Sequence, residues 1–250
     1  MRLTSDVLLV GGGTLTGFGV SADFDAHAYL LDGGGGELAL IDCGMGTPAG
    51  MERVLGNIAA AGLDPERVST LFLTHYHTDH AGGAARYRER LGLRVAISAE
   101  AAPALESADH EATSFRAARE LGIFPADFAY DACPVDDRRA DGDTRRVGRL
   151  SVHFVATPGH SAGHGSYFVT GGERAYLFAG DAVFAGGKIF LQATADCDLQ
   201  ASLESIRRLA ALEFDALLPG HGPVALSDGH AHIEIAKAAL DRLAVPGSLV

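Results

Sequence analysis

The chain has 250 residues, which is enough to bury a large core, and we expect one domain spanning residues 1–250. Its 32 acidic and 20 basic side chains give a formal net charge of −12, which disfavours nucleic acid as a partner because Lys and Arg must neutralise the phosphates. A hydrophobic fraction of 47% with 21% charged residues is typical of a globular protein in water, and no apolar run is long enough for a bilayer. We therefore expect a small-molecule substrate, no nucleic acid and no membrane partner; a homodimer is compatible with these properties.

The cysteines and the N-terminal residues bear on the compartment. Cys43, Cys133 and Cys197 are an odd, widely spaced set without a Cys-x-x-Cys pair, which favours free thiols in a reducing environment. Asp6 interrupts the first apolar residues and no cleavage site follows them. We expect a cytoplasmic protein.

The N-terminal part alternates short apolar runs with glycine-rich turns. We predict strands at residues 7–10, 26–31 and 37–41. The run Gly11-Gly12-Gly13 lacks the third glycine of a dinucleotide fingerprint, because position 16 is Thr, so we interpret it as a loop. His27 opens the second strand, where a structural role is favoured and a contact with substrate is the alternative.

The segment Thr74–His80 directly follows an apolar, strand-like run at residues 68–73. His75 and His77 are two residues apart, so on an extended backbone they point to the same side. Asp79 and His80 come where the chain turns toward a helix, so their side chains point elsewhere. Three imidazoles and a carboxylate so close together are costly to desolvate without a cation, which indicates a metal site.

Three distant positions repeat one local pattern. His160, Asp181 and His221 each follow a glycine at the end of an apolar run. Strands that deliver residues to one edge of a layered sheet have this pattern, because active sites are built on loops held by the strands behind them. We therefore expect all three side chains at the site of Thr74–His80.

The remaining segments are less specific. Helical spacing or composition predicts helices at residues 48–61, 84–91, 203–212 and 229–243. Residues 99–121 are Ala-rich and helical in composition, with a break at Pro103. The aromatic stretch Ile123 to Tyr130 is a candidate lid, although packing against the body of the protein explains it equally well. The charged stretch 136–149 is interpreted as a solvated hairpin turn.

Four segments, in this order, resemble the metallo-β-lactamase superfamily: Thr74–His80 with its HxHxDH motif, Thr157-Pro158-Gly159-His160, Ala179-Gly180-Asp181 and Pro219-Gly220-His221-Gly222. The resemblance runs from about Val7 to Leu243 and implies a four-layer αββα sandwich of the α/β (α+β) class, with a two-metal site between its sheets. It also implies two sets of metal ligands joined by one bridging carboxylate: His75, His77 and His160 for the first metal, Asp79, His80 and His221 for the second, and Asp181 between them.

The resemblance implies hydrolysis by a hydroxide that two divalent metal ions activate, with Zn²⁺ favoured and Fe or Mn as alternatives. The catalytic candidates are Asp181, which would touch both ions, and Asp79, which could carry a proton to the leaving group. Asp42 follows the third strand, and we interpret it as a carboxylate that orients a metal-binding imidazole. His164 is interpreted as structural support.

The segment after Asp181 is similar to the glyoxalase II and lactonase branch, which implies cleavage of a lactone, thioester or related acyl bond. Phe184 and Phe190 flank Lys188 there, and we predict an apolar wall with one cation for an anionic substrate group. The alternative is that both rings are core and Lys188 is solvated. Phe18 and Phe24 precede His27 and are candidate cavity walls, as His27 is a candidate substrate contact.

Two other activities stay open on the same scaffold. A mononuclear iron sulfur dioxygenase would use two His and one Asp from the same set of residues. A β-lactamase-type amide hydrolase is disfavoured by the Asp at position 181, where two β-lactamase groups have a Cys ligand, and by the missing secretion signal. Metal content and substrate separate these alternatives.

Overall fold

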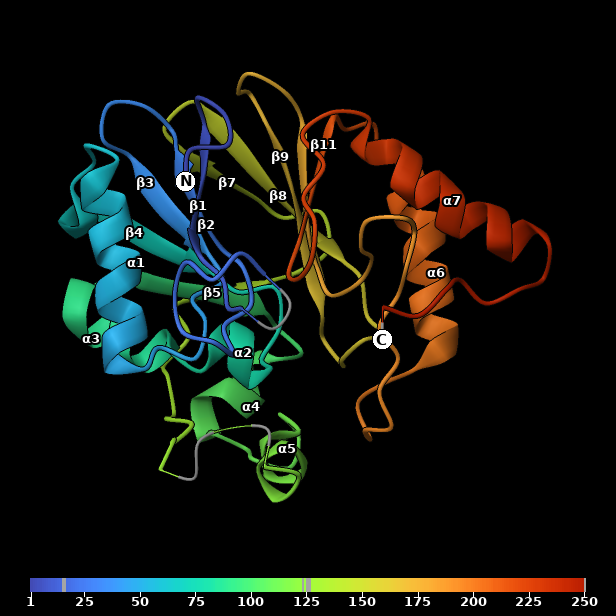
Figure 1. Cartoon of the computed structure of the whole chain (residues 1–250), viewed down its shortest axis with the longest axis horizontal. Helices are drawn as coiled ribbons and strands as arrows, with labels where there is room; N and C mark the ends of the chain where they lie inside the picture. Colours follow the sequence, from blue (N-terminus) through green and yellow to red (C-terminus); the bar gives the residue numbers. More distant parts are fainter. Residues whose placement is uncertain (15–16, 123, 125–126, 250) are drawn as a thin grey trace.

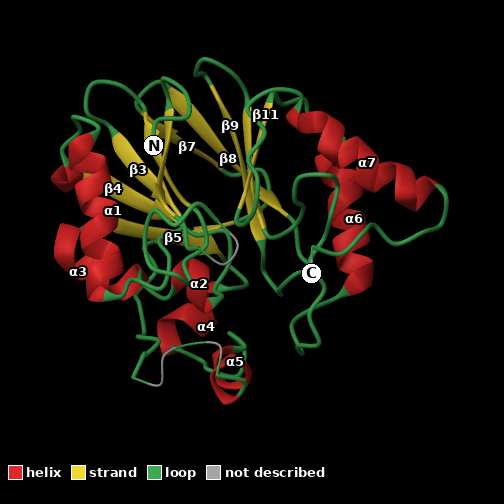
Figure 2. Ribbon diagram, in the orientation of Figure 1, coloured by secondary structure: helices red, strands yellow, loops and turns green. Residues whose placement is uncertain are grey.

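The computed structural model describes residues 1–14, 17–122, 124 and 127–249. Two mixed sheets lie face to face, and helices cover both outer faces (Figures 1 and 2). The first sheet has the strand order β1 (Val7–Gly11), β2 (Ala28–Asp32), β3 (Leu38–Ile41), β4 (Val68–Phe72), β5 (Arg94–Ser98), β6 (Asp137–Arg139). The second has the order β11 (Ala216–Pro219), β10 (Tyr176–Gly180), β9 (Gly165–Thr170), β8 (Leu150–Ala156), β7 (Thr144–Val147).

The side-chain alternation of the strands divides the core into layers. In β1, Val7 and Leu9 pack between the two sheets, whereas Leu8 and Val10 pack on the helix side. In β10, Tyr176 lies between the sheets and Leu177 faces the helices of the other flank. Because both faces of these strands are buried, the sequence shows continuous apolar runs instead of apolar–polar alternation.

Helices α1 (Pro48–Ala60) and α3 (Ala84–Leu91) flank the first sheet, and α6 (Leu199–Leu209) and α7 (Gly229–Asp241) flank the second (Figure 1). A short 3₁₀ helix, η1 (Pro65–Arg67), precedes β4. Helices α2 (Thr78–Ala81), α4 (Ala102–Ser107) and α5 (Phe115–Glu120) lie together at one end of the sandwich, the lower end in Figure 1. The metal-site motif runs into α2, so the site lies at this end. None of the helices within the described ranges has the length and apolar character needed to cross a membrane.

The predicted αββα architecture is confirmed. The interpretation of residues 136–149 as one hairpin turn is wrong, because β6 pairs with β5 in the first sheet while β7 pairs with β8 in the second. The segment therefore leads from the edge strand of the first sheet to the edge strand of the second. Its charges are compatible with strands because charged side chains are common on edge strands. The helix break predicted at Pro103 is also misplaced. Pro103 lies in the first turn of α4, where no backbone N–H is needed, and the chain breaks between Ala108 and Ser114, which both have positive φ.

Candidate metal centre

The ends of β3 and β4 position the HxHxDH segment. Asp42 follows β3 in a left-handed conformation with φ of 56°, which turns its carboxylate toward the next strand. The backbone N–H and the hydroxyl of Thr74 both donate to this carboxylate at 2.8 Å. His77 is still extended and precedes the first residue of α2, so Asp79 and His80 leave from a helical turn. The change from extended to helical backbone explains how neighbouring residues can point toward two different metal positions.

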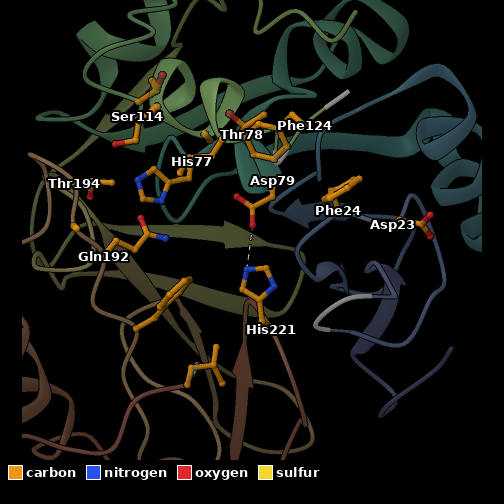
Figure 3. Close-up of a pocket in the computed structure, with 17 residues that line it drawn as sticks. Asp23, Phe24, His77, Thr78, Asp79, Ser114, Phe124, Gln192, Thr194 and His221 are labelled. Atoms are coloured by element: carbon orange, nitrogen blue, oxygen red, sulfur yellow. Dashed lines mark ion pairs between the residues drawn. The ribbon is translucent and has the colours of Figure 1, made fainter. Parts of the chain in front are cut away.

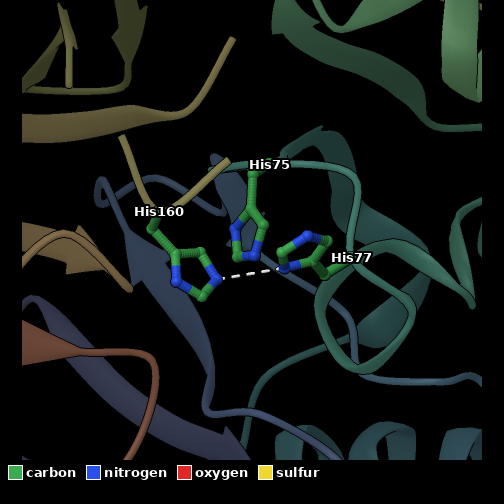
Figure 4. A group of neighbouring side chains, drawn as sticks. All are labelled: His75, His77 and His160. Carbon is green, nitrogen blue, oxygen red and sulfur yellow. Dashed lines mark hydrogen bonds between the residues drawn. The ribbon is translucent and has the colours of Figure 1, made fainter. Parts of the chain in front are cut away.

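His75, His77 and His160 form the first group of ligand-type side chains (Figure 4). Nδ1 of His77 lies 3.0 Å from Nε2 of His160. Nε2 of His75 is buried and has no hydrogen-bond partner among the residues that the structure describes. Atoms that share a tetrahedral Zn²⁺ at about 2.1 Å are themselves about 3.4 Å apart. The ligand atoms of the three imidazoles all lie within 4.8 Å of one another, so small adjustments would let them bind one cation.

Asp79, His80 and His221 form the second group. Nε2 of His221 lies 3.1 Å from the Asp79 carboxylate and 3.3 Å from Nε2 of His80, and the Asp79–His80 separation is 3.7 Å. These separations have the spacing of ligands around one ion, like those of the first group.

Asp181 lies between the two groups. Its carboxylate oxygens are 3.3, 3.5 and 3.4 Å from the Nε2 atoms of His80, His160 and His221. Gly180 precedes it with φ of 52°, and a Cβ at that position would lie 2.7 Å from Nε2 of His164. The side chain of Asp181 therefore reaches ligands of both groups, as a bridging carboxylate must.

The glycine before His221 shows why a glycine stands between each apolar run and its candidate ligand. A Cβ on Gly220 would lie 2.3 Å from the Asp181 carboxylate and 2.5 Å from the His80 ring. Only a residue without a side chain allows the backbone so close to the ligands.

Each of four imidazoles has one ring nitrogen held by a protein group, which determines the nitrogen that faces the site. The partners are Thr74 Oγ1 for Nδ1 of His75, Asp42 for Nδ1 of His80, the Phe190 carbonyl for Nδ1 of His160, and Asp196 for Nε2 of His77. Because Thr74 gives its own hydroxyl proton to Asp42, it accepts from His75. The predicted contact of Asp42 with an imidazole is present, at 2.8 Å from Nδ1 of His80.

His164 supports the site without joining it, as predicted. Its Nε2 accepts from the backbone N–H of Asp181 at 3.1 Å, and its Nδ1 donates to Thr157 at 2.9 Å.

Burial and the carboxylates determine the protonation of the site. Burial lowers the pKa of His75 well below 6.5 and that of His160 to about 4. Burial would raise the pKa of Asp79, but the charges of His80 and His221 hold it at about 2. Burial would lower the pKa of His221, but Asp181 raises it to about 9. A cation that binds here displaces the protons that the carboxylates attract.

A cavity of about 490 Å³ opens directly on these ligands (Figure 3). His77, Asp79 and His221 line one side of it. Apolar side chains from several segments line much of the rest: Phe24, Ala117, Leu121, Phe124, Phe190 and Leu249. Polar side chains, among them Ser114, Gln192 and Thr194, line the remainder. None of the described residues along its wall is Lys or Arg. The candidate metal ligands therefore face a largely apolar space, whose described wall carries the carboxylates of Asp23 and Asp79 but no Lys or Arg side chain.

The four predicted substrate contacts do not share this wall. Phe190 lines the cavity, but Phe184 is buried beside the His221 ring, with ring centroids 6.4 Å apart. Lys188 is exposed and lies off the wall, because a tight turn pairs it with Phe184 and leaves its side chain in solvent. His27 is fully buried and its Nδ1 lies 3.0 Å from the Pro219 carbonyl, where it supports the chain before His221. The predicted cation beside the metals is therefore wrong for Lys188, and the substrate contact is wrong for His27.

Part of the candidate lid at 123–130 contributes to the cavity wall. Phe124 lines the cavity, whereas Phe128 and Tyr130 are buried against the sandwich. Residues 123, 125 and 126 lie outside the described residues. Of the two loop aromatics, Phe24 lines the cavity, and Phe18 is 48% exposed and stacks on His27.

Sequence reasoning missed Asp196 and the wall formed by α5. Asp196 stands in a polar loop without the apolar-run and glycine pattern that marked Asp181, so no local signal distinguished it. The α5 residues were predicted only as part of a helix of ordinary composition.

Comparison with known proteins identifies the family. The family model described as the metallo-beta-lactamase superfamily matches residues 22–221. The chain belongs to the metallo-beta-lactamase superfamily. A metallo-beta-lactamase with a HARLDQ motif from Cronobacter sakazakii superposes with a TM-score of 0.73 at 20% identity, covering 97% of this chain and 96% of that one. That likeness shows the fold.

Two relatives are each 31% identical to this superfamily member over the aligned residues. A probable metallo-hydrolase of Burkholderia pseudomallei aligns over 214 residues, which are 80% of this chain and 68% of the relative. An atrochrysone carboxyl ACP thioesterase of Aspergillus fumigatus aligns over 198 residues, which are 79% of this chain and 51% of the relative. The chain thus spans about half the length of that thioesterase. Superfamily membership and the His/Asp groups together identify a metal-dependent hydrolase.

Proposed function

We propose that this hydrolase cleaves the acyl bond of an uncharged, apolar ester, thioester or lactone at a site for two divalent metal ions. The observation that carries the proposal is the apolar cavity of about 490 Å³ that opens on His77, Asp79 and His221. A cavity of this size accommodates a small molecule, and its walls favour hydrocarbon over charged groups. The relative named as a thioesterase supports an acyl substrate.

The residues assign the ligand roles. The first ion would be held by His75, His77 and His160, the second by Asp79, His80 and His221, and Asp181 would bridge them. When bound, two such ions act as Lewis acids and activate water for attack at neutral pH, with Zn²⁺ favoured by the nitrogen-rich ligand set and Fe or Mn as alternatives.

The protein groups orient the substrate and handle the proton. The apolar wall holds the acyl chain and excludes water from it, which leaves the carbonyl at the polar end beside Asp79 and His221. Water adds to the carbonyl carbon and the bond from carbon to oxygen or sulfur breaks, which gives a carboxylic acid and an alcohol or thiol. Asp79 has a side chain that is 22% exposed at the cavity, where its carboxylate can pass a proton to the leaving atom.

The absence of Lys and Arg from the described part of the wall revises the substrate class. The sequence predicted an acyl group with one anionic handle, bound by Lys188. With Lys188 in solvent and Asp23 and Asp79 on the wall, a substrate carboxylate meets like charges in the cavity. We therefore propose a neutral substrate.

A substrate panel tests the proposal. We expect kcat/KM for neutral lactones and acyl thioesters to rise by up to about fourfold per added methylene, until the cavity is filled, because each buried methylene contributes about 0.8 kcal/mol. Analogues with a carboxylate on the acyl chain, β-lactams and phosphodiesters should turn over poorly. Lys188→Ala is the control and should leave every rate unchanged. Turnover of phosphodiesters alone, or a preference for the carboxylate-bearing analogues, contradicts the proposal.

Metal analysis tests it against the iron dioxygenase. We expect two divalent ions per chain after purification without chelator. One iron per chain with oxygen uptake on a persulfide would establish the dioxygenase instead.

A further inference from the structure

Asp196 lies in the loop between β10 and α6 and contacts three parts of the site. Its side chain is only 7% exposed. One carboxylate oxygen lies 2.9 Å from Nε2 of His77 and accepts a hydrogen bond from the Tyr76 hydroxyl at 3.4 Å. The other oxygen accepts a hydrogen bond from the hydroxyl of Ser114 at 3.0 Å. One carboxylate therefore joins the metal-site motif, the residue before α5 and its own loop.

The contact with His77 determines how this imidazole faces the metal site. Because Asp196 accepts from Nε2–H, it is Nδ1 of His77 that lies 3.0 Å from Nε2 of His160. His75 and His80 are oriented differently from His77: their ring partners, Thr74 and Asp42, lie at the ends of strands of the first sheet. The orientation of His77 depends on a loop.

The contact with Ser114 reaches the cavity wall. Ser114 lies directly before α5 in a left-handed conformation with φ of 55°, a strained position for a residue with a side chain. Ser114 lines the cavity on the same side as Gln192 and Thr194, which belong to the Asp196 loop (Figure 3). Ala117 of α5 also lines the cavity. The Asp196 carboxylate therefore links His77 both to Ser114 and to the loop that carries Gln192 and Thr194.

We propose that Asp196 is a positioning residue that orients His77 for the metal and couples metal binding to ordering of the cavity wall at α5. Part of this inference rests on the proposed function, because it requires His77 to hold a metal. The coupling is reciprocal: a metal that fixes His77 also fixes Asp196 and Ser114, and an ordered α5 strengthens metal binding by the same factor.

Zinc affinity tests the contact with His77. For Asp196→Asn we expect one of the two zinc equivalents to bind about 10- to 100-fold more weakly, the usual cost of losing a group that orients a metal ligand, while the other equivalent is unchanged. Competition with a chromophoric chelator measures both affinities. Asp198→Asn is the matched control in the same loop, because Asp198 caps α6 without touching an imidazole and Asn caps equally well.

Two results would contradict different claims. Both zinc affinities within about twofold of the wild type contradict the inference, even where the melting temperature falls. A wild-type protein that binds no zinc contradicts the proposed function instead.

Hydrogen exchange tests the contact with Ser114 and does not require Asp196 to be replaced. We expect zinc to slow amide exchange in residues 113–121 of the wild type, because a fixed His77 holds Ser114 through Asp196. Ser114→Ala keeps the Asp196–His77 contact, so both zinc equivalents should still bind, but zinc should no longer slow exchange in α5. Equal protection of α5 by zinc in both proteins contradicts the coupling.

Discussion

Asp6 and Asp181 are both buried aspartates at the ends of strands, with exposed fractions of 0% and 3%, but their partners differ in kind. Asp6 precedes β1 at the end of the sandwich away from α2 (Figure 1). It accepts from the Tyr176 hydroxyl at 2.8 Å and also from Arg149 and the backbone N–H of Glu173. Asp181 lies among three imidazoles at 3.3–3.5 Å, beyond the usual 2.7–3.2 Å of a hydrogen bond.

The difference separates a structural carboxylate from one arranged for a ligand. A buried charge costs free energy unless it is paired, and around Asp6 the protein supplies the pairing itself. Around Asp181 the imidazole nitrogens converge on its carboxylate at 3.3–3.5 Å, and Nε2 of His75 nearby has no partner within the described residues. A metal ion between such atoms supplies the missing interactions.

Asp181→Asn should have the largest effect at the metal end. The substitution keeps the size of the side chain but removes the charge that faces both metal positions. We expect loss of one metal equivalent and a fall in kcat of more than a hundredfold, above the cost of losing a residue that only supports a ligand. Elemental analysis and steady-state kinetics measure both effects.

Full occupancy by two metals with a near-normal rate would remove Asp181 from the site.

Asp6→Asn should have the opposite profile. It leaves Arg149 and the Glu173 N–H without their charged acceptor, so we expect the free energy of unfolding to fall by about 2–4 kcal/mol. Metal content and kcat should stay at wild-type values, because the change lies at the other end of the sheets. Urea unfolding measures the stability, and Glu173→Gln, at an exposed carboxylate, is the control with an expected loss below about 1 kcal/mol. A change in metal content would mean that the two ends are not independent.

Acid should remove the stabilising contribution that the charged Asp6 makes to the folded protein. Burial would raise the pKa of its carboxyl, but the Glu173 N–H, the Tyr176 hydroxyl and Arg149 together hold it below 3.8. The unfolded chain therefore takes up the proton at a higher pH than the folded protein, so the contribution of Asp6 is complete above about pH 4 and is lost as the pH falls through the folded value.

We expect the stability difference between wild type and Asp6→Asn to narrow below about pH 4. The measurement requires metal-free protein, since acid also releases metals. A difference that stays constant from pH 3 to 6 would show that Asp6 contributes no charge-dependent stability.

The resemblance of four sequence segments to a known family implied the αββα fold, and the residue pattern itself gathered the seven candidate ligands. His75, His77, Asp79 and His80 are close in the chain, so local backbone geometry alone places them together. His160, Asp181 and His221 each follow a glycine at a strand end, and strand ends of one layered sheet meet at one edge. The sequence predicted that Asp42 orients an imidazole, and the structure identifies that imidazole as His80, because β3 and β4 are neighbours.

Only the tertiary structure decided what faces the ligands. Lys188 and Phe184 are near Asp181 in the chain, yet a tight turn puts one in solvent and the other in the core. Ala117 and Asp196 are further from Asp181 in the chain, yet Ala117 lines the cavity and Asp196 contacts His77. Short helices and polar loops have no periodicity that records their direction, so their positions depend on long-range packing that local sequence does not encode.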